Sequence, residues 1–318
     1  MSARRASPAL VLLLLLCGFT APPPKRLGEI PRADFLAEGV AIAPRGDVLV
    51  SGVQGRTVLR WTPRGVTPWL KGQAAGGLFG MAADARRDRL WISKTDGDDV
   101  PGGSGPGVTG VLEARLSDGI VLAHHAAPQD AKRHWIGDLV LAADGTVFAS
   151  DSLNGQLYRL KPGGKALEVV SETGLKSPQG LVMDPDGKSL ILGDYSTGLH
   201  RVDLTTGEVG PAMPAGGAEL RGLDALKRHG RDLIATQNGT KTQRVLRLRL
   251  SADERSIEAV DVLAKGPELL EDVSLGAVDH DRFVFVARSG WAGFDDKGRP
   301  NGKVPLPPVL AAVPLPPG

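Results

Sequence analysis

The fold is decided by the stretch SPQGLVMDPDGKSLILGDYSTGLHRVDLTTGEV, residues 177–209, because its pattern occurs more than once in the chain. A second copy lies just upstream at 136–163, IGDLVLAADGTVFASDSLNGQLYRLKPG. In this alignment AADG matches DPDG, and SDSLNGQLYRL matches GDYSTGLHRVD. Self-similarity at a period of about forty residues indicates a repeat architecture.

The same pattern occurs six times along the chain. The six units cover 38–65, 79–97 with 110–119, 136–163, 177–209, 222–239 with 243–253, and 275–298 with 308–315. In the third unit the runs DLVLA, TVFAS, QLYRL and ALEVVS predict four short strands, and Asp-Gly and Asn-Gly pairs between them favour hairpins. Four antiparallel strands per repeat are typical of a propeller blade. We therefore expect an all-β fold, a six-bladed β-propeller spanning residues 30–315; the alternative is a β-sandwich with chance similarity between glycine-rich turns.

The composition of the chain bears on its size class and on the kinds of molecule it could bind. The chain has 318 residues, of which 42% are hydrophobic, and its formal net charge is +2. All-β domains of this length occur as single units, and there is enough apolar material for one large core. The small net charge gives no indication of nucleic-acid binding. We expect a small-molecule ligand or substrate, with any protein partner unknown, and no membrane span once the N-terminal segment is removed.

The N-terminus predicts export. A short basic segment, MSARR, precedes the apolar run ALVLLLLLCGFT, and APPPK follows. This order is typical of a secretory signal peptide, which we place at residues 1–21, so the protein is expected to be secreted or periplasmic. The alternatives are an uncleaved anchor and lipidation at Cys17. Cys17 is the only cysteine, so a processed chain would have no disulfide and no thiolate chemistry.

Four segments carry a resemblance to a known family: EGVAIAP (38–44), GDLVLAADGTVFASDSLNG (137–155), SPQGLVMDPDGKSLILGDYSTGL (177–199) and DALKRHGRDLIATQNG (224–239). Together they resemble the SMP-30/gluconolactonase/LRE-like six-bladed propellers over nearly all of the processed chain. The resemblance implies a lactone or small-ester hydrolase with one divalent cation at the mouth of the central channel.

The resemblance also implies particular site residues. It assigns Glu38, Gln179 and Asp224 as metal ligands, with Gln179 in place of a family asparagine. A further family asparagine falls on Gly137, which leaves Asp138 beside it as a possible catalytic base. Oxygen ligands of this kind suit Ca²⁺ or Mg²⁺, and such a cation would polarise a lactone carbonyl.

Two functions stay open at this stage. One is the metal-assisted hydrolase, and the other is a non-catalytic propeller whose channel mouth binds a small molecule or a partner protein. Glutamine is one methylene longer than asparagine, which displaces its oxygen by about 1.5 Å. Trp291 either caps a binding pocket or fills space between blades. Asn238 either forms a tight turn or reaches toward the mouth.

Overall fold

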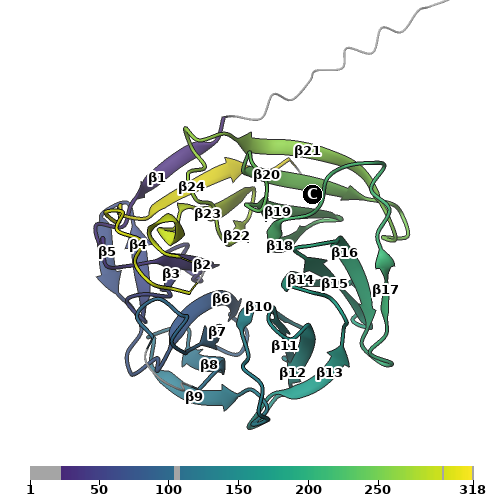
Figure 1. Cartoon of the computed structure of the whole chain (residues 1–318), viewed down its shortest axis with the longest axis horizontal. Coiled ribbons are helices and arrows are strands. Elements are labelled where there is room, and N and C mark those ends of the chain that lie inside the picture. Colours follow the sequence, from purple (N-terminus) through teal and green to yellow (C-terminus); the bar gives the residue numbers. More distant parts are fainter. Residues whose placement is uncertain (1–22, 104–107, 296, 317–318) are drawn as a thin grey trace, which may run out of the picture.

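The computed structural model describes residues 23–103, 108–295 and 297–316, so the expected signal peptide at 1–21 lies outside the described residues. Within them, the chain forms six four-stranded antiparallel sheets, which are arranged radially around one axis (Figure 1). We call the region around this axis, between the six inner strands, the central channel. The prediction of a six-bladed β-propeller is confirmed. The described part of the chain contains one short 3₁₀ helix, η1 (Trp291–Gly293), and no helix in it is long and apolar enough to cross a bilayer.

The first three blades follow the chain outward from the channel. Blade 1 contains β2 (Ala37–Ile42), β3 (Val48–Gly52), β4 (Val58–Thr62) and β5 (Gly65–Pro68). Blade 2 contains β6 (Gly77–Asp84), β7 (Arg89–Thr95), β8 (Gly110–Arg115) and β9 (Val121–Ala126). Blade 3 contains β10 (Ile136–Leu141), β11 (Val147–Asp151), β12 (Gln156–Leu160) and β13 (Glu168–Glu172).

The last three blades include the one that closes the ring. Blade 4 contains β14 (Pro178–Met183), β15 (Ser189–Asp194), β16 (Gly198–Asp203) and β17 (Val209–Ala212). Blade 5 contains β18 (Leu223–His229), β19 (Asp232–Gln237), β20 (Arg244–Leu250) and β21 (Ile257–Lys265). Blade 6 combines β22 (Gly276–Asp279), β23 (Arg282–Arg288) and β24 (Val309–Pro314) with the N-terminal strand β1 (Lys25–Glu29), which pairs with β24. Sequence analysis had not included β1.

The inner strands of blades 1–5 share one irregularity, a β-bulge near the start of the strand. In each of these strands, two residues lie opposite a single residue of the neighbouring strand. In blade 1, for example, Ala37 pairs with Gly52 and Val40 with Val50, so that two residues of β2 face one of β3. The first residues inside the five bulges are Glu38, Phe79, Gly137, Gln179 and Asp224. The second residues are Gly39, Gly80, Asp138, Gly180 and Ala225. Because a bulge re-aims a side chain, five blades present equivalent positions at one end of the channel.

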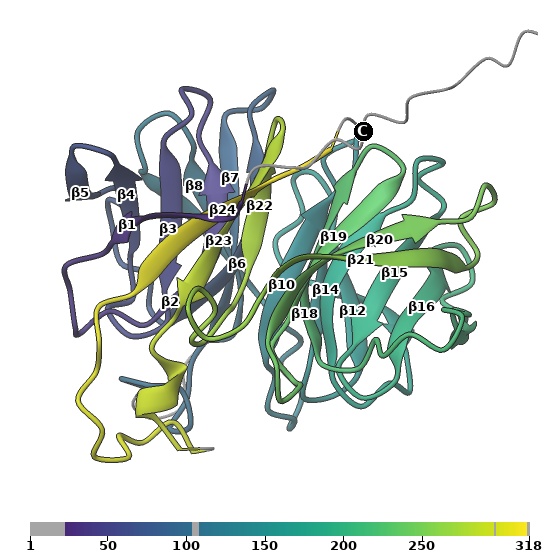
Figure 2. The same ribbon diagram turned by 90° about the horizontal axis from the view of Figure 1, so that it is seen from above.

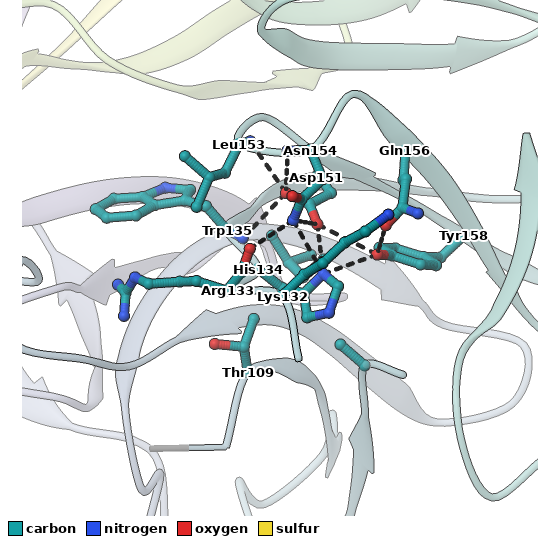
Figure 3. A network of polar contacts seen from close by, with 12 residues as sticks. Thr109, Lys132, Arg133, His134, Trp135, Asp151, Leu153, Asn154, Gln156 and Tyr158 are labelled. Carbon is teal, nitrogen blue, oxygen red and sulfur yellow. Dashed lines mark hydrogen bonds and ion pairs between the residues drawn. The ribbon is translucent and has the colours of Figure 1, made fainter. Parts of the chain in front are cut away.

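A polar network fixes the chain ahead of the inner strand of blade 3 (Figure 3). The Oδ1 atom of the fully buried Asp151 accepts hydrogen bonds of 3.0–3.1 Å from three backbone amides, those of Trp135, Leu153 and Asn154. Its Oδ2 atom lies 2.8 Å from Nδ1 of His134. Asp151 therefore holds the turn after β11 and the connection into β10 together, which determines where β10 begins.

Candidate functional site at the channel mouth

The five first bulge residues define the channel mouth, at the level where the inner strands begin. Two of them are carboxylates, Glu38 on β2 and Asp224 on β18, and one is the amide Gln179 on β14. Phe79 on β6 is apolar, and Gly137 on β10 has no side chain. The three predicted metal ligands thus occupy equivalent positions in three blades, although they are far apart in the sequence.

The carboxylates of Glu38 and Asp224 influence one another electrostatically. Burial raises the pKa of Glu38 to about 8, and the charge of Asp224 adds to this rise. Burial also raises the pKa of Asp224 to about 7, with a further contribution from the charge of Asp138. The charge of Asp272, just ahead of β22, raises both pKa values. Because burial and like charges both disfavour ionisation, ionising both carboxylates would leave negative charge at this site without full compensation.

Two side chains orient these carboxylates. The indole Nε1 of Trp291, in η1, donates a hydrogen bond of 2.6 Å to Oε2 of Glu38. The Nδ2 of Asn238 donates one of 2.7 Å to Oδ2 of Asp224, and the hydroxyl of Tyr195 donates in turn to Oδ1 of Asn238 at 2.8 Å. Trp291 therefore reaches the site from η1, and Asn238 reaches it from the turn after β19.

Asp138 lies one step further into the channel. Its Oδ2 atom accepts a hydrogen bond of 2.9 Å from Nζ of Lys227, and its Oδ1 accepts one of 2.9 Å from the amide of Leu139. The equivalent bulge residue in blade 2 is Gly80, where a Cβ atom would lie 2.1 Å from Oδ1 of Asp138. The buried carboxylate therefore fits only because blade 2 has a glycine beside it. Lys227 also lines a cavity of about 460 Å³ at the other end of the channel.

The two departures from the family pattern lie side by side. Nε2 of Gln179 donates a hydrogen bond of 2.9 Å to Oγ of Ser177. A Cβ atom at Gly137 would lie 3.4 Å from the other amide atom of Gln179, Oε1. At this distance a Cβ atom would make only an ordinary van der Waals contact, so the amide of Gln179 lies directly beside residue 137.

The donor set can be compared with what a metal needs. In the part of the chain that the structure describes, no three histidine, cysteine, aspartate or glutamate side chains are grouped to hold a metal ion. The remaining set is two carboxylates, Glu38 and Asp224, and the amide oxygen of Gln179. These hard oxygen donors suit Ca²⁺ or Mg²⁺, and a cation would offset the burial and the charge repulsion that together raise both carboxylate pKa values.

Aromatic side chains border this acidic site. Phe79 packs edge-on against Trp135, with ring centroids 5.4 Å apart, and Trp291 packs edge-on against Phe294 at 6.5 Å. All four belong to one apolar cluster with Leu36, Val53 and Val100. We call Phe79, Trp135, Trp291 and Phe294 the aromatic wall.

Sequence reasoning missed several of these residues. Phe79 and Lys227 lie on inner strands of blades 2 and 5, and Asp272 and Ser274 precede the inner strand of blade 6. The buried Ser274 hydroxyl lies close enough to lower the pKa of Glu38, although it makes no hydrogen bond of ordinary geometry. The only feature of the sequence that could have indicated these residues is their position, since each lies near the start of an inner strand or along one.

Comparison with known proteins supports the fold. No protein-family model and no curated protein matches the chain. Among solved structures, it is similar to a gluconolactonase from Xanthomonas campestris, with 19% identity, a TM-score of 0.61, and coverage of 93% of this chain and 96% of that one. It is also similar to a PQQ-bound aldose sugar dehydrogenase from Streptomyces coelicolor, with 16% identity, a TM-score of 0.60, and coverage of 92% and 99%. The chain thus has the propeller fold of gluconolactonases and sugar dehydrogenases.

Proposed function

We propose that the protein is a hydrolase of a lactone or small ester, with a divalent cation at the channel mouth. The observation that carries this proposal is that Glu38 and Asp224 occupy equivalent bulge positions in blades 1 and 5, close enough for the charge of Asp224 to raise the pKa of Glu38. A gluconolactonase among the solved structures of the same fold is consistent with it. Fold alone does not determine chemistry, so the argument depends on the site.

Each residue at the mouth has a proposed role. Glu38, Asp224 and Gln179 would bind Ca²⁺ or Mg²⁺ through oxygen, and the bound cation would supply carbonyl polarisation and a more acidic water. Trp291 fixes one oxygen of Glu38 through its 2.6 Å hydrogen bond and limits the access of water. Asp138 is the proposed proton acceptor, and its ion pair with Lys227 fixes the position of its carboxylate.

The change Glu38→Gln tests the proposal, because it keeps the shape of the side chain and removes a charge. We expect Ca²⁺ or Mg²⁺ to raise the melting temperature of the parent protein, since a ligand stabilises the state that binds it. At a hundredfold excess over Kd, the free energy of unfolding rises by about 2.7 kcal/mol. The variant should show a much smaller shift and lose lactone hydrolysis. Differential scanning fluorimetry with each cation, together with a lactonase assay, measures both.

Glu113→Gln is the matched control. Glu113 is half-buried in blade 2, where it pairs with Arg89 at 2.6 Å and with His125 at 3.1 Å. Its substitution should lower stability without changing the response to cations. If no divalent cation shifts the melting temperature of the parent protein, the metal-dependent hydrolase is wrong. The alternative of a non-catalytic binding propeller would then hold.

We also propose that the protein is exported to the periplasm or secreted. The support is the basic segment followed by an apolar run and prolines at residues 1–24. Cleavage after residue 21 would leave β1 intact for its pairing with β24. N-terminal sequencing of the protein from its own host tests this, and an intact Met1 on cytoplasmic protein would contradict it.

A further inference from the structure

The channel mouth is polar on one side and apolar on the other. The acidic side consists of Glu38, Asp224 and Asp272 with their partners. The other side is the aromatic wall, whose members Trp135, Trp291 and Phe294 are only half-buried. Phe79 occupies the blade 2 position equivalent to Glu38, but it is only 2% exposed. The accessible part of the aromatic wall is therefore Trp135, Trp291 and Phe294.

A second apolar feature lies against the same site. The segment 303–306, which we call the strap, forms a cavity of about 170 Å³ with η1, and the charged side chains of Glu271, Arg288 and Lys303 lie at its border. The strap exposes two large apolar side chains, Val304 at 84% and Leu306 at 54%. Asp272 also lines this cavity, and its charge raises the pKa of Glu38. The apolar cavity therefore adjoins the acidic site, and Figure 2 shows η1 and the connection after it extending from one face of the propeller.

Asp272 holds η1 in this position. Its Oδ2 atom accepts hydrogen bonds from Oγ of Ser289 at 2.7 Å and from the amide of Ala292 at 3.0 Å. The Trp291 indole then reaches Glu38 on the channel side of η1, whereas Gly290, Ala292 and Gly293 line the cavity under the strap. The short helix thus connects the acidic site with the apolar cavity.

We propose that the site selects a lactone or ester with an apolar ring face and an alkyl chain, and rejects polyhydroxylated sugar lactones. This inference rests on the proposed function for the acidic site. A sugar lactone has hydroxyl groups around its ring, and each loses hydrogen bonds to water if it enters an apolar site unpaired. An apolar ring packs against the aromatic wall instead, and its alkyl chain enters the cavity between η1 and the strap.

A chain-length series tests the proposal. We expect the kcat/KM of the parent protein for δ-lactones with propyl to hexyl side chains to rise by about fourfold per added methylene, and to exceed that for glucono-δ-lactone at least tenfold. Binding is measured separately with the matching alkyl δ-lactams, which resist hydrolysis. Their effect on the melting temperature should increase with chain length.

A second experiment replaces the two exposed apolar side chains of the strap with polar ones. Both substitutions in the variant Val304→Ser/Leu306→Ser fall on exposed side chains, so folding should be unaffected. We expect KM for the hexyl lactone to rise about tenfold with kcat little changed, and the lactam shift to shrink. The control variant, Val169→Ser/Val262→Ser, changes two apolar residues that are 44% and 46% exposed on outer strands, and should behave as the parent protein does.

The outcomes separate this inference from the proposed function. If no lactone is hydrolysed but lactam binding still grows with chain length and weakens in the strap variant, the hydrolase is wrong and the ligand class stands. If glucono-δ-lactone is the better substrate, or if lactam binding is absent or independent of chain length, the inference is overturned.

Discussion

Glu38, a proposed metal ligand, is a carboxylate that is unfavourable to ionise in its buried position. Its side chain is 7% exposed, and its carboxylate lies near those of Asp224 and Asp272, each of which raises its pKa. The indole of Trp291 offsets part of this rise in pKa by donating a hydrogen bond to the carboxylate. An isolated carboxylate in such a place favours its protonated form, so the folded protein should bind protons there more tightly than the unfolded chain.

This proton binding predicts how stability depends on pH without a divalent cation. The pKa of Glu38 is raised from 4.5 to about 8 and that of Asp224 from 3.8 to about 7. Between about pH 6.5 and 8 the folded state holds more protons than the unfolded state, so the free energy of unfolding should fall as pH rises, by at least ~1 kcal/mol. Urea unfolding in EDTA across this range measures the slope.

Histidine side chains also titrate near the lower end of this pH range. Burial lowers the pKa of His124 from 6.5, so this group has the opposite effect on the slope, and its effect fades as the pH rises further above that value. Glu38→Gln should flatten the slope, because it removes the group with the largest rise. A stability that stays level or increases from pH 6.5 to 8 would show that the two carboxylates are already ionised without a cation.

At the scale of elements, the repeated β-bulge is the device that builds the site. It displaces the first bulge residue of five inner strands, and the second residue is glycine or alanine in four of them because the next blade approaches closely. A Cβ atom at Gly39 would lie 2.2 Å from the backbone oxygen of Phe79. Asp138 is the exception, accommodated by Gly80.

The close approach predicts a large effect of one methyl group. Gly39→Ala should destabilise the protein by more than ~2 kcal/mol, because the clash is with backbone and overpacking forces the strands apart. Gly193→Ala on β15 is the matched control, since its nearest neighbours to a Cβ atom lie 3.4 and 3.7 Å away, and should cost less than ~1 kcal/mol. Chemical denaturation of both variants measures the difference. Equal effects would mean that the inner strands can separate to admit the methyl group.

At the scale of the whole molecule, stability depends on closing the ring of blades. The last blade takes β22–β24 from the C-terminal end of the chain and β1 from the N-terminal end. β1 pairs with β24 between Lys25 and Glu29, and Glu29 forms an ion pair of 3.1 Å with Arg288 of β23. Removing β1 would expose an unpaired strand edge, which favours association between chains.

Truncation measures the contribution of this closure. A chain that begins at Ile30 should melt at least several degrees lower than one that begins at Pro23, and should aggregate more readily on heating. Thermal unfolding followed by light scattering compares the two, with the chain from Pro23 as the control. If both melt together and neither aggregates, β1 contributes no closure.

The sequence by itself determined the architecture, because six copies of one local pattern with Asp-Gly and Asn-Gly turns each specify short strands and hairpins. The family resemblance marked Glu38, Gln179 and Asp224 as site residues, and the structure places them at equivalent points of three blades. The contribution of β1 was not predictable in this way, since a lone strand carries no repeat and its pairing partner lies almost three hundred residues away.

Only the tertiary structure decided what surrounds those positions. The structure decided three contacts between residues of different blades: the hydrogen bond from Trp291 to Glu38, the ion pair of Asp138 with Lys227, and the position of the Gln179 amide beside Gly137. Local sequence fixes strand periodicity within a blade, but the rotation and spacing between blades follow from core packing across the whole ring. The distances between site residues depend on this packing between blades. The repeats therefore specified each blade, and the packing of the ring specified which side chains meet between blades.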